Sequence, residues 1–307
     1  RKRSQARFRK RCGAKRNSSR MAGNLEGFQR ESLRAHMKLG IPVWYGDIRR
    51  LGLEKAISRV SYLGFDYFEL SLDYPIHIFK KTESIHTNAQ RFGLGYAFHA
   101  PWAGMEIASP ISEIRNASLE VMRESIESIS GLEPYYYNAH ILNHIPTYRF
   151  EEIKRKSDKY ALYALNRLKR LGKKHKINII IENNPCLFMG LPEHFNKIEK
   201  ICLDIGHAVI VRWIQKKDYN VDEWFKMHKN RIEAIHFHDC ILTGRPIDHL
   251  VLGEGQLDIE RLVTIIKNSN CRYVLLETVA KADKSIPTES DFKKEQKFCR
   301  RLFGPVV

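Results

Sequence analysis

Residues 201–208 read Ile-Cys-Leu-Asp-Ile-Gly-His-Ala, and this stretch carries the pattern that decides the fold. A short apolar, β-branched run ends in an acidic residue, and a histidine follows three positions later. Runs of this length and composition favour buried β-strands. Longer segments with helical spacing lie between this run and similar ones elsewhere in the chain, so the fold depends on how often the unit recurs.

Eight runs rich in β-branched or aromatic residues predict eight strands. They cover residues 39–44, 65–72, 94–100, 135–141, 178–183, 201–205, 232–237 and 273–277. Eight strand–helix alternations match a (β/α)8 TIM barrel, an α/β fold, in count and length. An open doubly wound sheet is the alternative, but residues 43–47 (Val-Trp-Tyr-Gly-Asp) lack the glycine-rich phosphate loop that such sheets carry after the first strand.

Helical spacing between the strands predicts several helix ends. Ser109 is expected as an N-cap, with Pro110 at the first helical position. A stripe from Ala161 to Leu171 predicts a second helix, with Gly172 as its stop. The last helix is expected over residues 292–302.

The net charge of +17 is concentrated at the start of the 307-residue chain. Residues 1–20 hold ten Lys or Arg and no acidic residue, which leaves +7 for the remainder. We therefore expect a basic, disordered extension over residues 1–36 and a single domain over residues 37–307. A nucleic-acid-binding tail is one interpretation of the extension. A cloning remnant or translated upstream sequence is the favoured one, because Met37 opens the first patterned segment.

Composition narrows the class of protein. Hydrophobic residues make up 43% and charged residues 28%, which is typical of a globular chain. No stretch approaches the roughly 18 apolar residues of a membrane span, and no signal peptide opens the chain. The six cysteines form no CxxC pair, which favours free thiols in a reducing compartment. We therefore expect a cytoplasmic protein without a membrane partner.

Six consecutive predicted strands end in a histidine or an acidic residue. These residues are His99, His140, Glu182, Asp204, His236 and Glu277. The carboxyl ends of parallel barrel strands meet on one face, where active sites lie, so the side chains should converge. The three carboxylates would repel one another, and a divalent cation removes that repulsion. The pattern predicts a metal centre, and His207 is expected to reach it from the loop after Asp204.

Three further residues lie near the predicted strand ends. His238 has the opposite parity to His236 and is expected to point away from the barrel lumen. Trp44 and Trp102 are expected to wall the substrate pocket. The turn over residues 252–255 (Leu-Gly-Glu-Gly) allows a tight loop, but nothing in it indicates a phosphate cradle.

Five motifs taken in order resemble one known family. They are His-Ala-Pro at 99–101, Ile-Glu-Asn-Asn at 181–184, Cys-Leu-Asp-Ile-Gly-His-Ala at 202–208, His-Phe-His-Asp at 236–239 and His-x-x-Leu-Gly-Glu-Gly at 249–255. Over residues 37–307 the chain resembles the xylose isomerase-like TIM barrel superfamily. That group includes sugar and sugar-phosphate isomerases and epimerases, and abasic-site nucleases of the endonuclease IV type.

The isomerase and epimerase branch implies one set of roles. Glu182, Asp204, His236 and Glu277 would bind a divalent metal, Zn²⁺ or Mn²⁺, with Mg²⁺ or Co²⁺ as alternatives. Glu182 and Glu277 would also act as catalytic acid and base, moving a proton through a metal-stabilised enediolate. The expected substrate is a small sugar or sugar phosphate, and a homo-oligomer is compatible with this branch.

The nuclease branch is the alternative and implies a multinuclear zinc site acting on abasic DNA. Its additional ligands would be His99, His140, His207 and His249. The family's aspartate two positions before the last histidine is replaced here by Ile247, and Asp248 is expected to be out of phase. These departures favour the isomerase or epimerase. A metal-dependent lyase or dehydratase acting on a cyclic polyol is a third possibility, because enediolate chemistry also permits elimination.

Overall fold

The computed structural model describes residues 37–75, 82–142, 151–184, 192–215 and 221–304. The predicted basic extension over residues 1–36 lies outside the described residues. Within them, no helix is long and apolar enough to cross a membrane. Four cysteines are described, and all are buried free thiols: Cys202, Cys240, Cys271 and Cys299.

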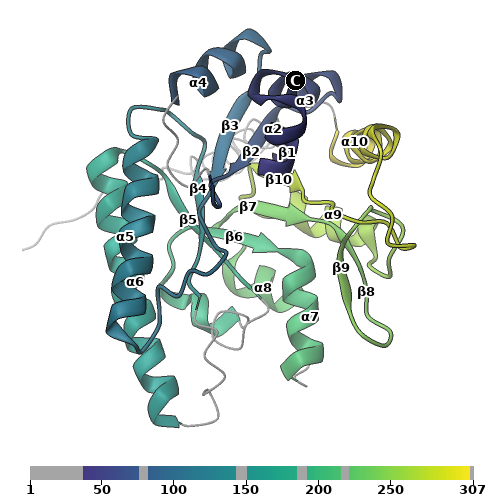
Figure 1. Ribbon diagram of the computed structural model, residues 1–307. Helices are drawn as coiled ribbons and strands as arrows, with labels where there is room; N and C mark the ends of the chain where they lie inside the picture. Colours follow the sequence, from purple (N-terminus) through teal and green to yellow (C-terminus); the bar gives the residue numbers. More distant parts are fainter. Residues whose placement is uncertain (1–36, 76–81, 143–150, 185–191, 216–220, 305–307) are drawn as a thin grey trace, which may run out of the picture. The chain divides into compact units, whose positions relative to one another are not determined.

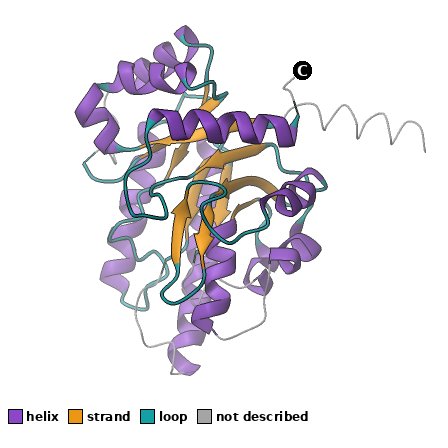
Figure 2. Ribbon diagram, turned by 90° about the vertical axis from the view of Figure 1, so that its right-hand side faces the viewer, coloured by secondary structure: helices purple, strands orange, loops and turns teal. Residues whose placement is uncertain are grey.

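Eight parallel strands close into a barrel with helices around it (Figure 2). The strands are β1 (Lys38–Val43), β2 (Tyr67–Ser71), β3 (Gly95–His99), β4 (Tyr137–His140), β5 (Ile179–Glu182), β6 (Ile201–Asp204), β7 (Ile232–Phe237) and β10 (Tyr273–Leu276). Each lies within or overlaps a predicted run. Pairing of β1 with both β2 and β10 closes the sheet, which confirms the TIM barrel and excludes the open sheet.

The helices follow the strands in chain order and are labelled in Figure 1. They are α2 (Tyr45–Leu51), α3 (Leu53–Tyr62), α4 (Thr82–Arg91), α5 (Ser112–Ser128), α6 (Glu151–His175), the 3-10 helix η2 (Pro192–Lys197), α7 (Ile205–Gln215), α8 (Val221–His228), α9 (Ile259–Lys267) and α10 (Glu289–Phe303). Helix α10 includes the predicted last helix and begins three residues earlier.

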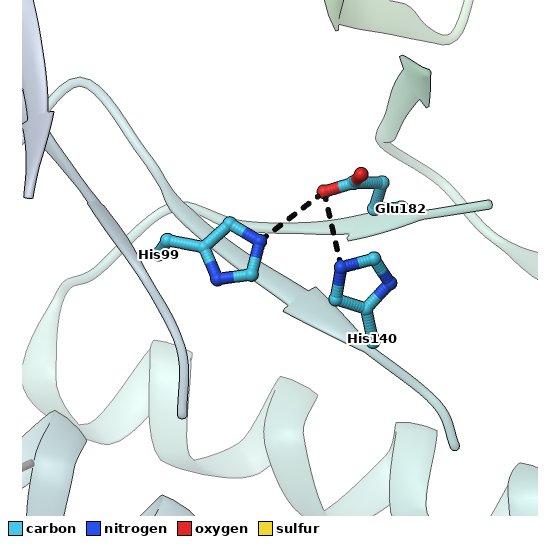
Figure 3. Close-up of side chains that lie close together, drawn as sticks. All are labelled: His99, His140 and Glu182. Atoms are coloured by element: carbon cyan, nitrogen blue, oxygen red, sulfur yellow. Dashed lines mark ion pairs between the residues drawn. The ribbon is translucent and has the colours of Figure 1, made fainter. Parts of the chain in front are cut away.

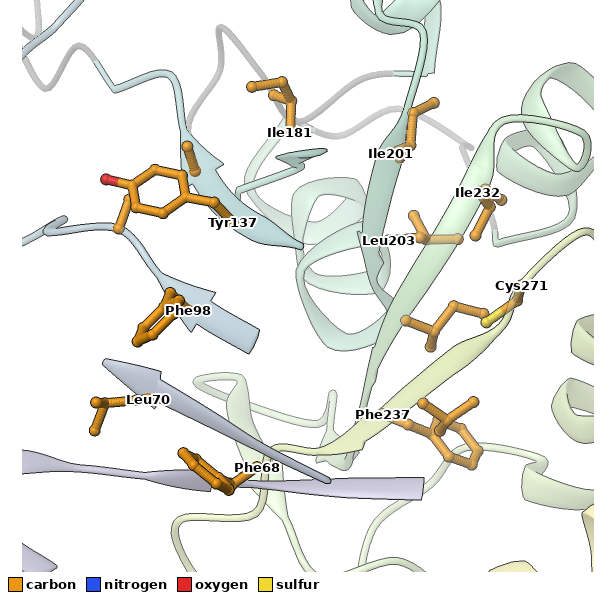
Figure 4. Packing of buried hydrophobic residues seen from close by; sticks show 14 of the residues in the cluster. Phe68, Leu70, Phe98, Tyr137, Ile181, Ile201, Leu203, Ile232, Phe237 and Cys271 are labelled. Carbon is orange, nitrogen blue, oxygen red and sulfur yellow. The ribbon is translucent and has the colours of Figure 1, made fainter. Parts of the chain in front are cut away.

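The two faces of the barrel strands pack in two different apolar clusters. The larger cluster, between strands and helices, contains Phe68, Phe98 and Leu203 (Figure 4). The smaller one fills the barrel lumen with residues of the opposite parity, including Tyr67 and Cys202. Successive side chains of a strand point to opposite faces. Residues two positions after the lumen cluster therefore continue up the same lumen toward the carboxyl ends of the strands.

Helix α5 begins later than predicted. Its N-cap is Ile111, and Ser109 lies two residues before it. The Ser109 hydroxyl accepts a hydrogen bond from the Ile111 N–H at 3.2 Å, and the Ser109 carbonyl accepts from the Arg115 guanidinium at 2.6 Å. These local bonds form a turn in place of the predicted cap, since serine hydroxyls compete for nearby backbone groups.

Helix α6 continues through Gly172, so the predicted stop is wrong. Ile177 donates its N–H to the Gly172 carbonyl at 2.9 Å. A Cβ at position 172 would lie 2.8 Å from the Ile177 carbonyl oxygen. The glycine is therefore explained by the close approach of the returning chain. The helix ends at His175, before Lys176 takes a positive φ of 56°.

An antiparallel hairpin that the sequence did not predict follows β7. It pairs β8 (Asp239–Ile241) with β9 (Ile247–Leu250), and Figure 1 shows it beside the barrel near α7 and α9. The β9 strand carries Asp248 and His249 back toward the carboxyl ends of the barrel strands. This hairpin decides which residues complete the site.

Candidate metal centre

The four central predicted ligands lie close together because all of them are on the strand face that points into the barrel lumen. Ligand atoms of Glu182, Asp204, His236 and Glu277 all lie within 4.8 Å of one another, and all four residues are buried. The first three come from β5, β6 and β7, and the fourth directly follows β10. Each lies two positions after a residue of the lumen cluster, namely Ile180, Cys202, Ala234 and Leu275.

The charges of this central group fit a divalent cation. Nδ1 of His236 lies 3.3 Å from Glu182 Oε1 and 2.7 Å from Glu277 Oε2, yet it makes no hydrogen bond of suitable geometry with any described residue. Among the described residues, Glu182, Asp204 and Glu277 form ion pairs with histidines and with no Lys or Arg. Buried carboxylates without a fixed counter-ion are costly, and a bound metal compensates them.

The carboxylates of the central group are held ionised. Burial acts to raise the pKa of Glu182, but the charges of His140 and His236 outweigh it and keep that pKa well below its usual value. Burial likewise opposes ionisation of Glu277, and His236 with His249 lowers its pKa well below the ordinary range. Both groups are therefore ionised, which is the form that a metal ligand requires.

A second group shares Glu182 and is drawn in Figure 3. Nε2 of His99 and Nε2 of His140 each lie 3.5 Å from Glu182 Oε2. Burial lowers the pKa of His140 to about 4, helped by repulsion from His99 and His207. Burial would also lower the pKa of His99, but Glu182 and Glu69 raise it to about 9. Burial therefore dominates the pKa of His140, whereas the surrounding carboxylates dominate the pKa of His99.

A third group contains His207, Asp248 and His249, with ligand atoms within 4.8 Å of one another. Asp248 Oδ1 lies 3.2 Å from His249 Nδ1. The expectation that Asp248 is out of phase is therefore wrong. His249 has a positive φ of 55°, which breaks the alternation of β9 and brings neighbouring side chains to the same group.

His238 contradicts the prediction that it points away from the lumen. Its Nδ1 accepts the backbone N–H of His249 at 2.8 Å, so its Nε2 carries the proton and donates to Asp204 Oδ2 at 3.1 Å. Its ring stacks on His249 with centroids 4.1 Å apart. Because β7 ends at Phe237, strand parity no longer applies to His238. Its geometry orients Asp204.

Two lumen residues near the central group were not predicted. Glu69 of β2 is 2% exposed, and its Oε2 lies 3.4 Å from Nε2 of His236. Asn138 of β4 donates to Glu182 and lies 3.4 Å from the same His236 nitrogen. The alternation of side chains along β2 could have identified Glu69, since it lies on the same lumen face as Tyr67. Both residues lie two positions before the carboxyl ends of their strands, where the sequence pattern predicts no ligand.

The two predicted wall residues follow strand ends on the same face of the barrel. Trp44 is the half-buried N-cap residue of α2. Trp102, after β3, is 44% exposed. Asp73, after β2, fixes the loop of Trp102 by accepting the N–H groups of Trp102 and Ala103 at 2.9 and 3.1 Å. Contact of either tryptophan with a substrate stays a prediction.

The turn after β9 directs its backbone amides at a carboxylate of the chain itself. Asp239, which is fully buried, accepts N–H groups of Gly253 at 3.0 Å, Gly255 at 2.9 Å and Leu257 at 3.1 Å. A Cβ on Gly255 would lie 2.2 Å from the same carboxylate. Amides used in this way are not free to hold a phosphate, in agreement with the expectation for this turn.

Comparison with known proteins assigns the family. The family model for the xylose isomerase-like TIM barrel matches residues 57–302, which is most of the chain, so the chain belongs to this family. A relative among curated proteins is the uncharacterized protein MJ1614 of Methanocaldococcus jannaschii. It is 26% identical over 189 residues, covering 59% of this chain and 70% of the relative.

Solved structures share the fold at low identity. A D-tagatose 3-epimerase-like protein has a TM-score of 0.70 and 20% identity, covering 87% of this chain and 97% of its own. D-allulose 3-epimerase from Methylomonas sp. has a TM-score of 0.69 and 17% identity, covering 87% and 98%. The TTHB071 protein from Thermus thermophilus, soaked with ZnCl2, has a TM-score of 0.63 and 18% identity, covering 87% and 98%.

Proposed function

We propose that the protein is a divalent-metal-dependent isomerase or epimerase of a sugar or sugar phosphate. The observation that carries the proposal is the buried central group, in which Glu182 and Glu277 each contact Nδ1 of His236. Similarity to sugar 3-epimerases supports this substrate class. Residues 37–307 would form the catalytic domain.

The residues of the central group would divide the work between them. Glu182, Asp204, His236 and Glu277 would hold a divalent cation, Zn²⁺ or Mn²⁺ by the mixture of donors. The bound cation would act as a Lewis acid toward the sugar carbonyl. One of the two glutamates removes the proton from the neighbouring carbon, and the other returns a proton. Return to the opposite face gives an epimer, and return to the former carbonyl carbon gives an isomer.

A second candidate function is hydrolysis of DNA at abasic sites by a multinuclear zinc centre. The observation that favours it is the pair of flanking groups, one with His99 and His140 and the other with His207, Asp248 and His249. Asp248 would supply the acidic ligand that the sequence pattern lacked. Two or three closely spaced cations would suit in-line displacement at phosphorus.

Activity assays on two substrate panels separate the two candidate functions. The full chain is loaded with Zn²⁺ or Mn²⁺, freed of excess metal, and assayed on ketoses, ketose phosphates and duplex DNA with one abasic site. The proposal predicts sugar turnover without nicking, and loss of that turnover in Glu182→Gln. Nicking by the parent but not by Glu182→Gln would establish the second candidate. Unchanged sugar turnover in Glu182→Gln would refute the assignment of the site.

A further inference from the structure

A buried carboxylate outside the groups of candidate metal ligands lies against the chain segments that carry two of those ligands, His249 and Glu277. Glu295 is on α10, the last helix, and is 2% exposed. Its Oε1 accepts the N–H of Leu252 at 2.8 Å and the hydroxyl of Thr278 at 2.9 Å. Leu252 lies three residues after His249, and Thr278 directly follows Glu277. One oxygen therefore connects the two segments that carry these ligands.

The two segments are also bonded to each other. The His249 carbonyl accepts the N–H groups of Val279 at 2.8 Å and Ala280 at 3.1 Å, and the Ala280 carbonyl accepts from Val251 at 3.1 Å. His249 holds a left-handed backbone conformation that costs a non-glycine residue about 1 kcal/mol or more. Surrounding bonds must maintain such a conformation, and Glu295 anchors this network to the helix layer.

A purely stabilising role does not account for the second carboxylate oxygen. Oε2 of Glu295 is buried and has no hydrogen-bond partner in the described structure. Burial, with the nearby carboxylates of Asp291 and Glu254, raises the pKa of Glu295 to about 7. An incompletely paired buried carboxylate destabilises a fold. A chain retains such a group where the bonds made by Oε1 serve the site.

We propose that Glu295 is a positioning residue that holds the His249 and Glu277 segments in register, so that cation binding by the central group, which includes Glu277, depends on helix α10. This inference rests on the proposed metal-dependent function, because it requires that the central group binds a cation. It assigns no chemical step to Glu295, which does not contact the central group directly.

Titration of the full chain with Co²⁺, followed by visible absorption and by analysis of bound metal, tests the inference. Glu295→Ala should weaken Co²⁺ binding about ten- to a hundred-fold, as loss of an outer-shell partner typically does. Glu295→Gln keeps an oxygen acceptor of the same shape and should restore binding close to that of the parent. Thr278→Val removes one of the two bonds with little change in volume and should give a smaller weakening.

Glu233→Ala is the matched control. Glu233, at the opposite end of the barrel, is also a buried glutamate and bonds Asn178 at 3.1 Å and Arg272. It should bind Co²⁺ like the parent. Parent-like binding in both Glu295→Ala and Thr278→Val would overturn the inference alone, as would equal weakening in Glu233→Ala. A parent that binds no Co²⁺, Zn²⁺ or Mn²⁺ would overturn the proposed function and the inference with it.

Discussion

At the scale of single residues, the atoms that surround a position explain which residue occupies it. Gly206 lies in the first turn of α7, where a Cβ would be 2.0 Å from Cε1 of His238. His238 in turn donates to Asp204. The glycine therefore leaves room for the ring that orients a predicted metal ligand. This explains the glycine in the sequence Asp-Ile-Gly-His better than a need for backbone freedom does, because its φ is not positive.

Gly206→Ala should displace His238 and weaken both the fold and the metal centre. We expect a loss of about 1–3 kcal/mol in the free energy of unfolding, as for overpacked cores, measured by urea denaturation. Co²⁺ binding should weaken in the same variant. Gly46→Ala is the control, because a Cβ at that helical position would meet no atom within 4 Å beyond its chain neighbours and its own helix backbone. A Gly206→Ala protein as stable as Gly46→Ala would contradict the assignment.

Glu295 should make stability depend on pH. Its folded-state pKa is raised from 4.5 to about 7, chiefly by burial. Below pH 4.5 both states hold the proton, so its contribution to stability is fully present. Between pH 4.5 and about 7 only the folded state holds it, so the contribution falls as pH rises, by about 3 kcal/mol in all. Urea unfolding across this range should show the fall in the parent relative to Glu295→Gln, and parallel curves would refute it.

Among the elements, the β8–β9 hairpin contributes most to the site beyond the barrel itself. It supplies Asp248 and His249, and its geometry depends on the segment that follows it. Asp239 fixes that segment by accepting backbone N–H groups from Cys240 at 2.8 Å and from Gly253, Gly255 and Leu257. A barrel strand, a hairpin and a turn are thus joined through one buried carboxylate.

Asp239→Asn should destabilise the hairpin, because an amide nitrogen would replace one acceptor oxygen and face N–H donors. Leaving buried donors unpaired costs about 1–3 kcal/mol each, so a loss of at least about 2 kcal/mol is expected in urea unfolding. Hydrogen exchange should accelerate at Gly253, Gly255 and Leu257 in particular. Asp283→Asn, which changes an exposed turn residue, is the control. Protection at these amides equal to that of the parent would contradict this role for Asp239.

At the scale of the whole molecule, closure of the barrel brings several carboxylates together, and a bound cation would compensate their charge. Strands far apart in sequence bring Glu69, Glu182, Asp204 and Glu277 into one lumen, where they are all buried. Histidines are the ion-pair partners of these carboxylates among the described residues. Folding in the absence of metal therefore depends on protons taken up by histidines, whereas a bound cation would replace those protons.

Divalent metal should raise the melting temperature of the full chain, because it binds the folded state preferentially. Saturation at a hundred times the Kd adds about 2.7 kcal/mol to the free energy of unfolding. Thermal melts with Zn²⁺ or Mn²⁺ and with EDTA measure the effect. Glu182→Gln should respond much less, and Glu233→Ala should respond as the parent does. Equal shifts in the parent and Glu182→Gln would point to binding elsewhere.

The sequence by itself determined the barrel and the core of the candidate site. Eight short apolar runs separated by helical spacing admit few folds, and parallel strands in a closed barrel place all carboxyl ends on one face. Residues near those ends, such as Glu182 and His236, could therefore be grouped from the sequence alone. Strand periodicity depends only on residues close together in the chain, and so it can be recognised in the sequence.

The tertiary structure alone decided the contacts that no local period encodes. Gly172 looked like a helix stop because the approach of Ile177 cannot be read from spacing. His238 and Asp248 joined the site because parity ends with the strand and because His249 adopts a positive φ. Glu295 reaches the site from a helix whose packing on the barrel fixes its distance to Leu252 and Thr278. Such contacts depend on barrel closure and loop conformation, which are set by packing among distant residues.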